Sequence, residues 1–356
     1  MAALPDRLAR RTLELVNVRS VSRAEEQLAS HVVHVLRAGG VAVRDAGDTC
    51  VLAGTLARGE RPLVLLAGHL DTVPEQGNLP GRIEGDRVIG LGTTDMKGAD
   101  AVMVELALAL AGAATAIDVG FVWFGREELP FGDSALTPLL AREPALAEAD
   151  LAIVMEPTAN RVQLGCLGNV NATWTFHGRA GHSARPWLAD NAIHRLAEGV
   201  HALARVPHEI HDFGGLEYRE VVSTTTVSGG VALNVVPAEA VAQVNYRYPP
   251  GRSMEAAEAR LHGWCDPYGE LVVTGHAPSG PVPLDNPLVD ALLAAADAGP
   301  AEPKQAWTPV AEFGAAGIDA VNFGPGDPAF AHTVDEQVSI DALVRSYLVL
   351  ESLLCR

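Results

Sequence analysis

The first 165 residues combine continuous apolar runs with segments of helical periodicity. Residues 63–67, 119–124 and 151–155 are apolar throughout, which is typical of strands buried on both faces of a sheet. Residues 96–111 predict a helix between the first two runs. Strands that alternate with helices predict an α/β fold, in which helices flank a central, mostly parallel sheet.

A helix is also predicted near the N-terminus. Ser22 and Glu25 have the spacing of a capping box, and apolar residues follow at helical spacing as far as Leu36. The Gly-Gly pair that comes next would end this helix.

From residue 170 onward the pattern alternates with period two, as in strands with one buried face. A Gly- and Pro-rich stretch at 275–283 indicates a boundary. We therefore expect a discontinuous domain of residues 1–165 and 281–356, with a smaller domain inserted at 166–280. The inserted domain has the strand and helix order of a ferredoxin-like α+β unit, with elements predicted at 170–177, 191–204, 221–228, 240–248, 254–264 and 270–274.

Charge and cysteine content exclude several classes of function. The 356 residues include 26 basic and 44 acidic ones, and a net charge of −18 disfavours nucleic acid and anionic membranes as partners. We expect no membrane span and no signal peptide, because neither pattern is present. The scattered cysteines disfavour a disulfide scaffold or a thiolate zinc site and indicate a cytoplasmic protein; they are Cys50, Cys166, Cys265 and Cys355.

Residue types that bind metals follow the predicted strands. His69 and Asp71 come after the first apolar run, and an extended chain would let the carboxylate accept the second N–H of the imidazole. Asp95, between Gly-rich segments, is either a helix N-cap or a carboxylate that bridges two metals. Each pattern alone is weak, because such residues are common without a metal.

Three further candidates are acidic or imidazole side chains near strand ends. Glu127 and Glu128 are adjacent, so one could bind a metal while the other acts as a general base, or both could form a solvated turn. Glu156 follows residues 151–155, and His332 lies near the C-terminus. In an open α/β sheet, strand ends are where ligand sites form.

Taken together, these motifs resemble a family of cocatalytic metallopeptidases. That family includes succinyl-diaminopimelate desuccinylase, acetylornithine deacetylase, aminoacylase and glutamate carboxypeptidase. The resemblance covers nearly the whole chain and is nearest to the desuccinylases. It rests on GHLDTVP, GLGTTDMKG, EE, MEPT, GHSARP, NVVP, NYRY and GPGDPAFAHTVDE.

The resemblance implies two metal ions, with ligands assigned by motif position. It also implies a zinc-exopeptidase-like fold for the larger domain. Zn²⁺ is expected, with Co²⁺ or Mn²⁺ able to substitute. Asp71 would orient His69, and Glu127 would act as the general base that takes a proton from a metal-activated water. A cis Asp95–Met96 peptide bond is also implied. The metal ligands would be His69, Asp95, Glu128, Glu156 and His332, with Asp95 bridging both ions.

Substrate contacts are implied mainly in the inserted lid or dimerisation domain. His182 would stabilise the oxyanion and would reach the site from a partner subunit, so a homodimer is implied. Arg247 would bind a substrate carboxylate, and Asn234 and Arg185 are further candidates. The implied reaction is removal of the succinyl group from N-succinyl-L,L-diaminopimelate, a small-molecule substrate.

Pro309 and Glu312 depart from the family pattern, which often has Asp and Arg there, and residues 165–168 (GCLG) stand where some desuccinylases carry Arg. These departures keep acetylornithine deacetylase, or another N-acyl amino acid deacylase, dipeptidase or carboxypeptidase, as alternatives. From a different class, a non-catalytic binding protein with a decayed site is disfavoured because the motif residues are all present.

Overall fold

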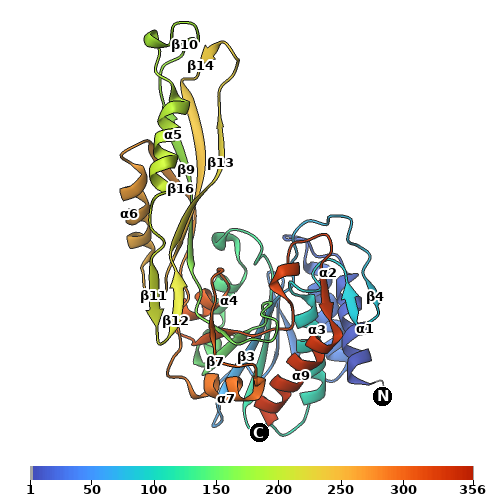
Figure 1. Ribbon diagram of the computed structural model, residues 1–356. Coiled ribbons are helices and arrows are strands. Elements are labelled where there is room, and N and C mark those ends of the chain that lie inside the picture. Colours follow the sequence, from blue (N-terminus) through green and yellow to red (C-terminus); the bar gives the residue numbers. More distant parts are fainter. Residues whose placement is uncertain (1–2, 356) are drawn as a thin grey trace. The chain divides into compact units, whose positions relative to one another are not determined.

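A computed structural model describes residues 3–355, which divide into two compact units. Unit 1 comprises the chain up to Gly165, Pro281–Lys304 and the chain from Thr308 onward. Unit 2 comprises Cys166–Gly280 and Gln305–Trp307. Each unit has its own sheet (Figure 1).

The central sheet of unit 1 is mixed, with a parallel core. Four neighbouring strands, β6, β3, β7 and β18, run parallel because helical segments connect them. The residues of these strands are buried, as predicted for β3, β6 and β7. In spatial order the strands are β1 (Val43–Gly47), β2 (Cys50–Gly54), β6 (Asp118–Phe124), β3 (Leu63–His69), β7 (Leu151–Val154), β18 (Ala320–Asn322), β8 (Gln163–Leu164) and β17 (Glu302–Pro303).

Helices cover this sheet, and α1, α3 and α9 pack against one another (Figure 1). The α-helices of unit 1 are α1 (Leu4–Val16), α2 (Glu26–Ala38), α3 (Lys97–Leu110), α4 (Leu136–Arg142), α7 (Pro287–Ala296), α8 (Val310–Ala315) and α9 (Ile340–Cys355). Short 3₁₀ turns are η1 (Phe131–Asp133), η2 (Pro144–Glu148) and η4 (Pro328–Phe330). A small antiparallel sheet is formed by β4 (Arg82–Glu84), β5 (Arg87–Ile89) and β19 (Gln337–Ser339).

The predicted capping box at the start of α2 is wrong. The Ser22 hydroxyl donates instead to the Asp71 carboxylate at 2.7 Å. Glu25 accepts from the backbone N–H groups of Arg23 and Arg126, at 2.9 and 3.1 Å. Both side chains therefore serve long-range contacts, which override the local capping pattern.

Unit 2 contains the expected ferredoxin-like arrangement, with antiparallel strand order β13-β15-β9-β16. One face packs on α5 and α6 around a buried aromatic core that includes Trp174, Phe176 and Tyr246. The six elements are β9 (Gly168–His177), α5 (Ala192–Leu203), β13 (Val221–Gly229), β15 (Glu239–Tyr248), α6 (Met254–Cys265) and β16 (Glu270–Ala277).

Two small antiparallel strand pairs and a 3₁₀ turn in unit 2 were not predicted. One pair is β10 (Gly181–His182) with β14 (Val235–Val236), and the turn η3 (Pro186–Leu188) follows β10. The other pair is β11 (Ile210–Phe213) with β12 (Leu216–Arg219). The two pairs lie at opposite ends of this unit (Figure 1). Their short strands carry too few residues for a reliable alternating pattern.

Within residues 3–355, no helix combines the length and the apolar character needed to cross a membrane.

Candidate functional site

The candidate site lies at the edge of the sheet where three parallel strands end. His69 is the last residue of β3 and is in register with Phe124, the last residue of β6. Glu127 and Glu128 follow β6, and Glu156 follows β7 on the other side of β3. The carboxyl ends of neighbouring parallel strands share one edge, so the sheet brings these four polar side chains together.

Asp95 and His332 reach the same place from other segments. The Asp95 carboxylate has Oδ1 at 3.0 Å from His69 Nε2 and Oδ2 at 3.4 Å from His332 Nε2. His332 Nε2 is also 3.0 Å from Glu128 Oε1. The Asp95 side chain thus lies between two imidazoles, and the alternative that it caps a helix is wrong. The Asp95–Met96 peptide bond is cis, as predicted.

Crowding of carboxylates and imidazoles shifts the pKa values in this site. Burial, and then the charge of Glu156, raises the pKa of Glu127 well above its ordinary value. Burial and the charge of Asp95 raise the pKa of Glu156 to about 7. Hydrogen bonds with Asp95 and Glu128 raise the pKa of His332 to about 10. The acids repel one another, and the imidazole holds a proton that partly offsets their charge.

These donors fit divalent metal ions. Ligand atoms of His69, Asp95 and Glu128 lie within 4.8 Å of one another, and so do those of His69, Glu127 and Glu156. Glu156 Oε1 is buried and finds no hydrogen-bond partner within residues 3–355. A buried carboxylate oxygen without a donor is costly unless a cation lies nearby. Imidazole and carboxylate together are the donor set of zinc and related ions.

Asp71 lies behind His69 and also holds the glutamate pair. His69 Nδ1 is 3.1 Å from the Asp71 backbone carbonyl and 3.5 Å from Oδ1. The two carboxylate oxygens accept from the backbone N–H groups of Glu127 and Glu128, at 3.0 and 3.1 Å. The Asp71 carbonyl is therefore closer to the imidazole than the carboxylate is. The carboxylate, which was expected to contact His69, also accepts hydrogen bonds from the loop that carries the glutamates.

Glu336 is a candidate that the sequence patterns missed. Its carboxylate is 1% exposed and accepts from the backbone N–H groups of Gly92, Thr94 and Asp95, at 2.8, 3.0 and 3.0 Å. It thereby fixes the backbone that leads into Asp95. The available signal was an acidic residue four positions after His332, but its partners lie more than 240 positions away.

Three of the predicted substrate contacts lie together in unit 2. His182 is on β10, its side chain is exposed, and its carbonyl accepts from the backbone N–H of Arg185 at 2.8 Å. The carbonyl of Asn234 accepts from the backbone N–H of Ser183 at 3.0 Å. His182, Arg185 and Asn234 therefore form one group around the β10–β14 pair.

Arg247 is not part of that group. It lies near the C-terminal end of β15, opposite Asn169 of β9, and its Nε donates to Asn245 Oδ1 at 3.0 Å. The β10–β14 pair lies beyond the other end of β15, whose first residue is Glu239. Within unit 2, the long strand β15 thus separates Arg247 from the exposed group.

Glu312, one of the two departures from the family pattern, is buried in unit 1. Its Oε1 accepts from the Ser134 hydroxyl at 2.9 Å and from the backbone N–H and hydroxyl of Thr137 at 3.0 and 2.6 Å. Its carboxylate stabilises the start of α4. Pro309 precedes α8. The carboxylate at 312 therefore has a local packing role.

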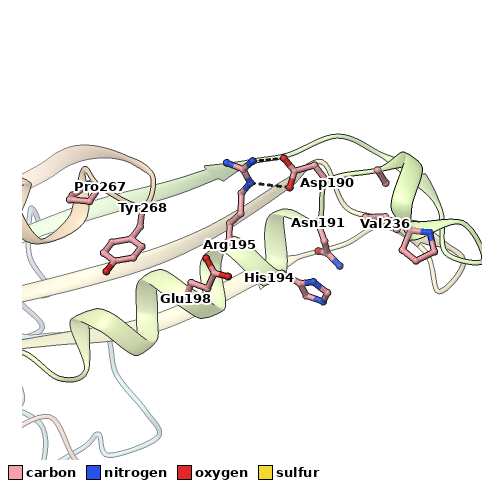
Figure 2. Close-up of a pocket in the computed structure, with 10 residues that line it drawn as sticks. Asp190, Asn191, His194, Arg195, Glu198, Val236, Pro267 and Tyr268 are labelled. Atoms are coloured by element: carbon pink, nitrogen blue, oxygen red, sulfur yellow. Dashed lines mark hydrogen bonds and ion pairs between the residues drawn. The ribbon is translucent and has the colours of Figure 1, made fainter.

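A separate pocket of 510 Å³ lies beside α5 in unit 2 (Figure 2). Figure 2 shows Arg195 turned onto Asp190, with which it forms an ion pair. His194, Glu198 and Tyr268 also line the pocket. None of the residues that line it is among those predicted for the site.

Comparison with known proteins agrees with this arrangement. The model of peptidase family M20/M25/M40 matches residues 65–356. A Mycobacterium tuberculosis protein named for succinyl-diaminopimelate desuccinylase (DapE) is 40% identical over 332 residues, 92% of each chain. Succinyl-diaminopimelate desuccinylase of Corynebacterium glutamicum is 35% identical over 352 residues, 96% of this chain and 95% of the other.

More distant similarity extends to other activities and to solved structures. N-acetyl-L-citrulline deacetylase of Xanthomonas campestris is 32% identical over 323 residues, 86% of this chain and 84% of the other. The crystal structure of aminopeptidase PepT from Bacillus cereus superposes with a TM-score of 0.79 at 18% identity, covering 98% and 97% of the two chains. This last similarity concerns the fold alone. The chain belongs to peptidase family M20/M25/M40 and is a metal-dependent hydrolase of amide bonds.

Proposed function

We propose that this enzyme hydrolyses N-succinyl-L,L-diaminopimelate to succinate and L,L-diaminopimelate. The observation that carries the proposal is the convergence of His69, Asp95, Glu128, Glu156 and His332 around Glu127 in a chain that is 40% identical to a protein named for this activity. A cytoplasmic location, which the scattered cysteines favour, stays a prediction.

In this proposal the five donors would hold two metal ions, and Asp95 would serve both. His69 and Glu156 would serve one ion, and Glu128 and His332 would serve the other. Zn²⁺ suits this mixture of imidazole and carboxylate, and Co²⁺ or Mn²⁺ can replace it. When bound, such ions supply a water of lowered pKa and polarise the carbonyl that is attacked. The three ligating carboxylates would offset most of the positive charge of two divalent ions.

Glu127 is the general base of the proposed reaction. It takes one proton from the attacking water, whose oxygen bonds to the succinyl carbonyl carbon. The C–N bond then breaks, and Glu127 passes its proton to the nitrogen of the leaving amine. Burial raises the pKa of Glu127, which is the direction that favours uptake of a proton.

The remaining contacts are proposed to orient the substrate. Arg247 can pair with a substrate carboxylate in bidentate geometry. His182 can donate to the oxygen on which negative charge develops. Asn234 and Arg185, which share its end of unit 2, can bind the rest of the substrate.

We further propose a homodimer in which His182 and Arg247 act on one substrate from different chains. Arg247 lies eight residues along β15 from Glu239, about 26 Å at a rise of roughly 3.3 Å per residue. Two groups that far apart in one unit would not meet on one small substrate. The edge strand β13 is largely exposed, including Val227, and the exposed Trp187 and Leu233 lie near the His182 group. Unpaired strand edges and exposed apolar side chains favour association.

Another N-acyl amino acid is the second candidate substrate. Glu312 replaces a cation of the family pattern, and its carboxylate is occupied by Ser134 and Thr137. If that cation binds substrate elsewhere in the family, this chain has lost the contact. A relative named as a deacetylase keeps N-acetyl substrates open.

A substrate panel tests the assignment. Enzyme loaded with Zn²⁺ is incubated with N-succinyl-L,L-diaminopimelate, N-acetylornithine and N-acetylcitrulline, and amine release is measured. We expect kcat/KM for the succinyl substrate to exceed the others by at least about 100-fold, since unpaired polar groups penalise a wrong substrate strongly. Preference for an N-acetyl substrate would reject the desuccinylase assignment and keep the amide hydrolase.

A further inference from the structure

Residues 125–134, called here the glutamate loop, carry Glu127 and Glu128 between β6 and α4. A loop that presents a general base must hold its side chain within a fraction of an ångström of the productive geometry. Asp71 accepts from the backbone N–H groups of Glu127 and Glu128, the third and fourth residues of the loop. At the entry into the loop, the Gly125 carbonyl accepts from the Ala135 N–H at 3.1 Å, and the Arg126 side chain donates to the Asp133 carbonyl and to Asp48. None of these contacts holds the backbone N–H of Arg126, which immediately precedes Glu127.

Residues 22–25, called here the brace, contact the glutamate loop at that entry. The carboxylate of Glu25 accepts from the backbone N–H of Arg126 at 3.1 Å, immediately before Glu127. Arg126 has a φ of 61°, in the left-handed region that non-glycine residues seldom adopt. A hydrogen bond to its N–H stabilises a backbone conformation that the residue itself disfavours.

Packing leaves the loop little freedom beside Glu25. A Cβ on Gly125 would lie 3.2 Å from the Glu25 carboxyl carbon and 2.3 Å from Thr49 Oγ1, so glycine allows this close approach. Glu25 is itself 0% exposed. A buried carboxylate is retained at a cost, and here its Oε1 accepts two backbone N–H groups, from Arg23 and Arg126.

The rest of the brace contacts the loop or its support. The Ser22 hydroxyl donates to Asp71 Oδ2, the same oxygen that accepts from the N–H of Glu128. The Arg23 guanidinium lies 3.1 Å from the Asp133 carboxylate at the far end of the loop. Of the failed capping box, Glu25 therefore contacts the loop itself and Ser22 contacts Asp71, which supports the loop.

We propose that Glu25 is a positioning residue, which fixes the backbone at Arg126 and thereby the orientation of Glu127. It does not touch the substrate. The proposal rests on the proposed role of Glu127 as general base. Loss of the Glu25 acceptor would free the Arg126 backbone to leave the left-handed region, and the Glu127 carboxylate would move with it.

The test compares variants of Glu25 in the full-length, metal-loaded enzyme, with N-succinyl-L,L-diaminopimelate or the panel substrate that the wild type hydrolyses. Glu25→Leu removes the acceptor at similar volume, and we expect kcat to fall about 10- to 100-fold, as for small misplacements of a catalytic group. KM should stay within about threefold and metal content should not change, because the ligands and substrate contacts are elsewhere. Glu25→Gln keeps an acceptor oxygen and should restore kcat to within about threefold of wild type.

Val32→Ala is the control for a loss of stability alone. Val32 is buried in the same helix, α2, that follows the brace, and it is remote from the catalytic residues in sequence. It should lower Tm without lowering kcat by more than about twofold. If Glu25→Leu does not fold, Glu25→Asp replaces it, since the shorter side chain cannot reach both N–H groups.

The proposal is overturned if Glu25→Leu (or its Asp replacement) keeps kcat within twofold, if Glu25→Gln is as impaired, or if Val32→Ala loses as much turnover. Glu127→Gln is measured in parallel. When Glu127→Gln is inactive and Glu25→Leu is fully active, only the positioning role fails. When Glu127→Gln itself keeps wild-type turnover, the general base of the proposed function fails, and the positioning role fails with it.

Discussion

The Glu336 carboxylate accepts a hydrogen bond from the backbone N–H of Asp95 at 3.0 Å, across 241 positions of the sequence. The same carboxylate accepts from the N–H groups of Gly92 and Thr94, and it thereby fixes the turn that directs the Asp95 side chain toward both imidazoles. Groups that orient a metal ligand contribute to metal affinity although they do not touch the ion.

Replacing Glu336 should therefore weaken metal binding. We expect Glu336→Ala to lower the affinity for Zn²⁺ by about 10- to 100-fold, because three buried N–H groups lose their acceptor. Glu336→Gln, which keeps an acceptor oxygen, should have a smaller effect. Competition with a chromogenic chelator measures both affinities. Equal affinity in Glu336→Ala and wild type would show that the turn holds its shape without this carboxylate.

The adjacent glutamates should respond differently to the same substitution. Glu127→Gln should bind both metals and lose turnover by about 10²- to 10⁴-fold, the usual contribution of a general base. Glu128→Gln should lose one metal, because an amide is a poorer ligand than a carboxylate. Metal analysis and kcat for both variants separate the roles. Two bound metals and wild-type turnover in Glu127→Gln would reject it as the base.

Metal binding should release protons and weaken as the pH falls. In the metal-free protein the pKa of His332 is about 10 and that of Glu156 about 7, so a metal at pH 8 must displace the imidazole proton. Below pH 7 a carboxyl proton must leave as well. Affinity should fall by about tenfold per pH unit for each displaced proton. Calorimetry in buffers of different ionisation enthalpy counts the protons, and pH-independent affinity between pH 6 and 9 would contradict this prediction.

A chain-mixing experiment tests the proposed dimer. His182→Ala and Glu127→Gln should each be inactive alone. In a refolded equimolar mixture, half of the dimers are mixed, and each mixed dimer has one site with both native residues if they come from different chains. About a quarter of wild-type activity should return. If both residues act within one chain, every site keeps one defect and no activity returns.

Unit 2 should lose stability in acid through Glu220. Burial would raise its pKa, but hydrogen bonds from Arg252 and Tyr246 lower it from 4.5 to about 2. Its contribution is present above about pH 4.5 and is lost as the pH falls toward 2. Glu220→Gln should cost about 3 kcal/mol at pH 7, because Arg252 and Arg260 lose their carboxylate. Urea unfolding should show this difference shrink at pH 3; the same difference at both pH values would contradict the prediction.

Periodic patterns predicted most of the regular elements. The run at 151–155 became β7 (Leu151–Val154), and the alternating segment at 240–248 became β15 (Glu239–Tyr248). These elements are long, and burial of one or both faces leaves a strong period in the sequence. The β10–β14 pair, with two residues in each strand, has no such period.

The sequence by itself determined the fold class, the family and which polar residues follow the strands, because each of these is written in local patterns and short motifs. Tertiary structure alone decided where the side chains of Ser22, Glu25 and Glu336 are used. Local spacing predicted that Ser22 and Glu25 would cap a helix, yet they contact Asp71 and Arg126. The physical reason is that a buried polar group pairs with the partner that the folded chain brings near, and Asp71, Arg126 and Gly92 lie 49, 101 and 244 positions from Ser22, Glu25 and Glu336.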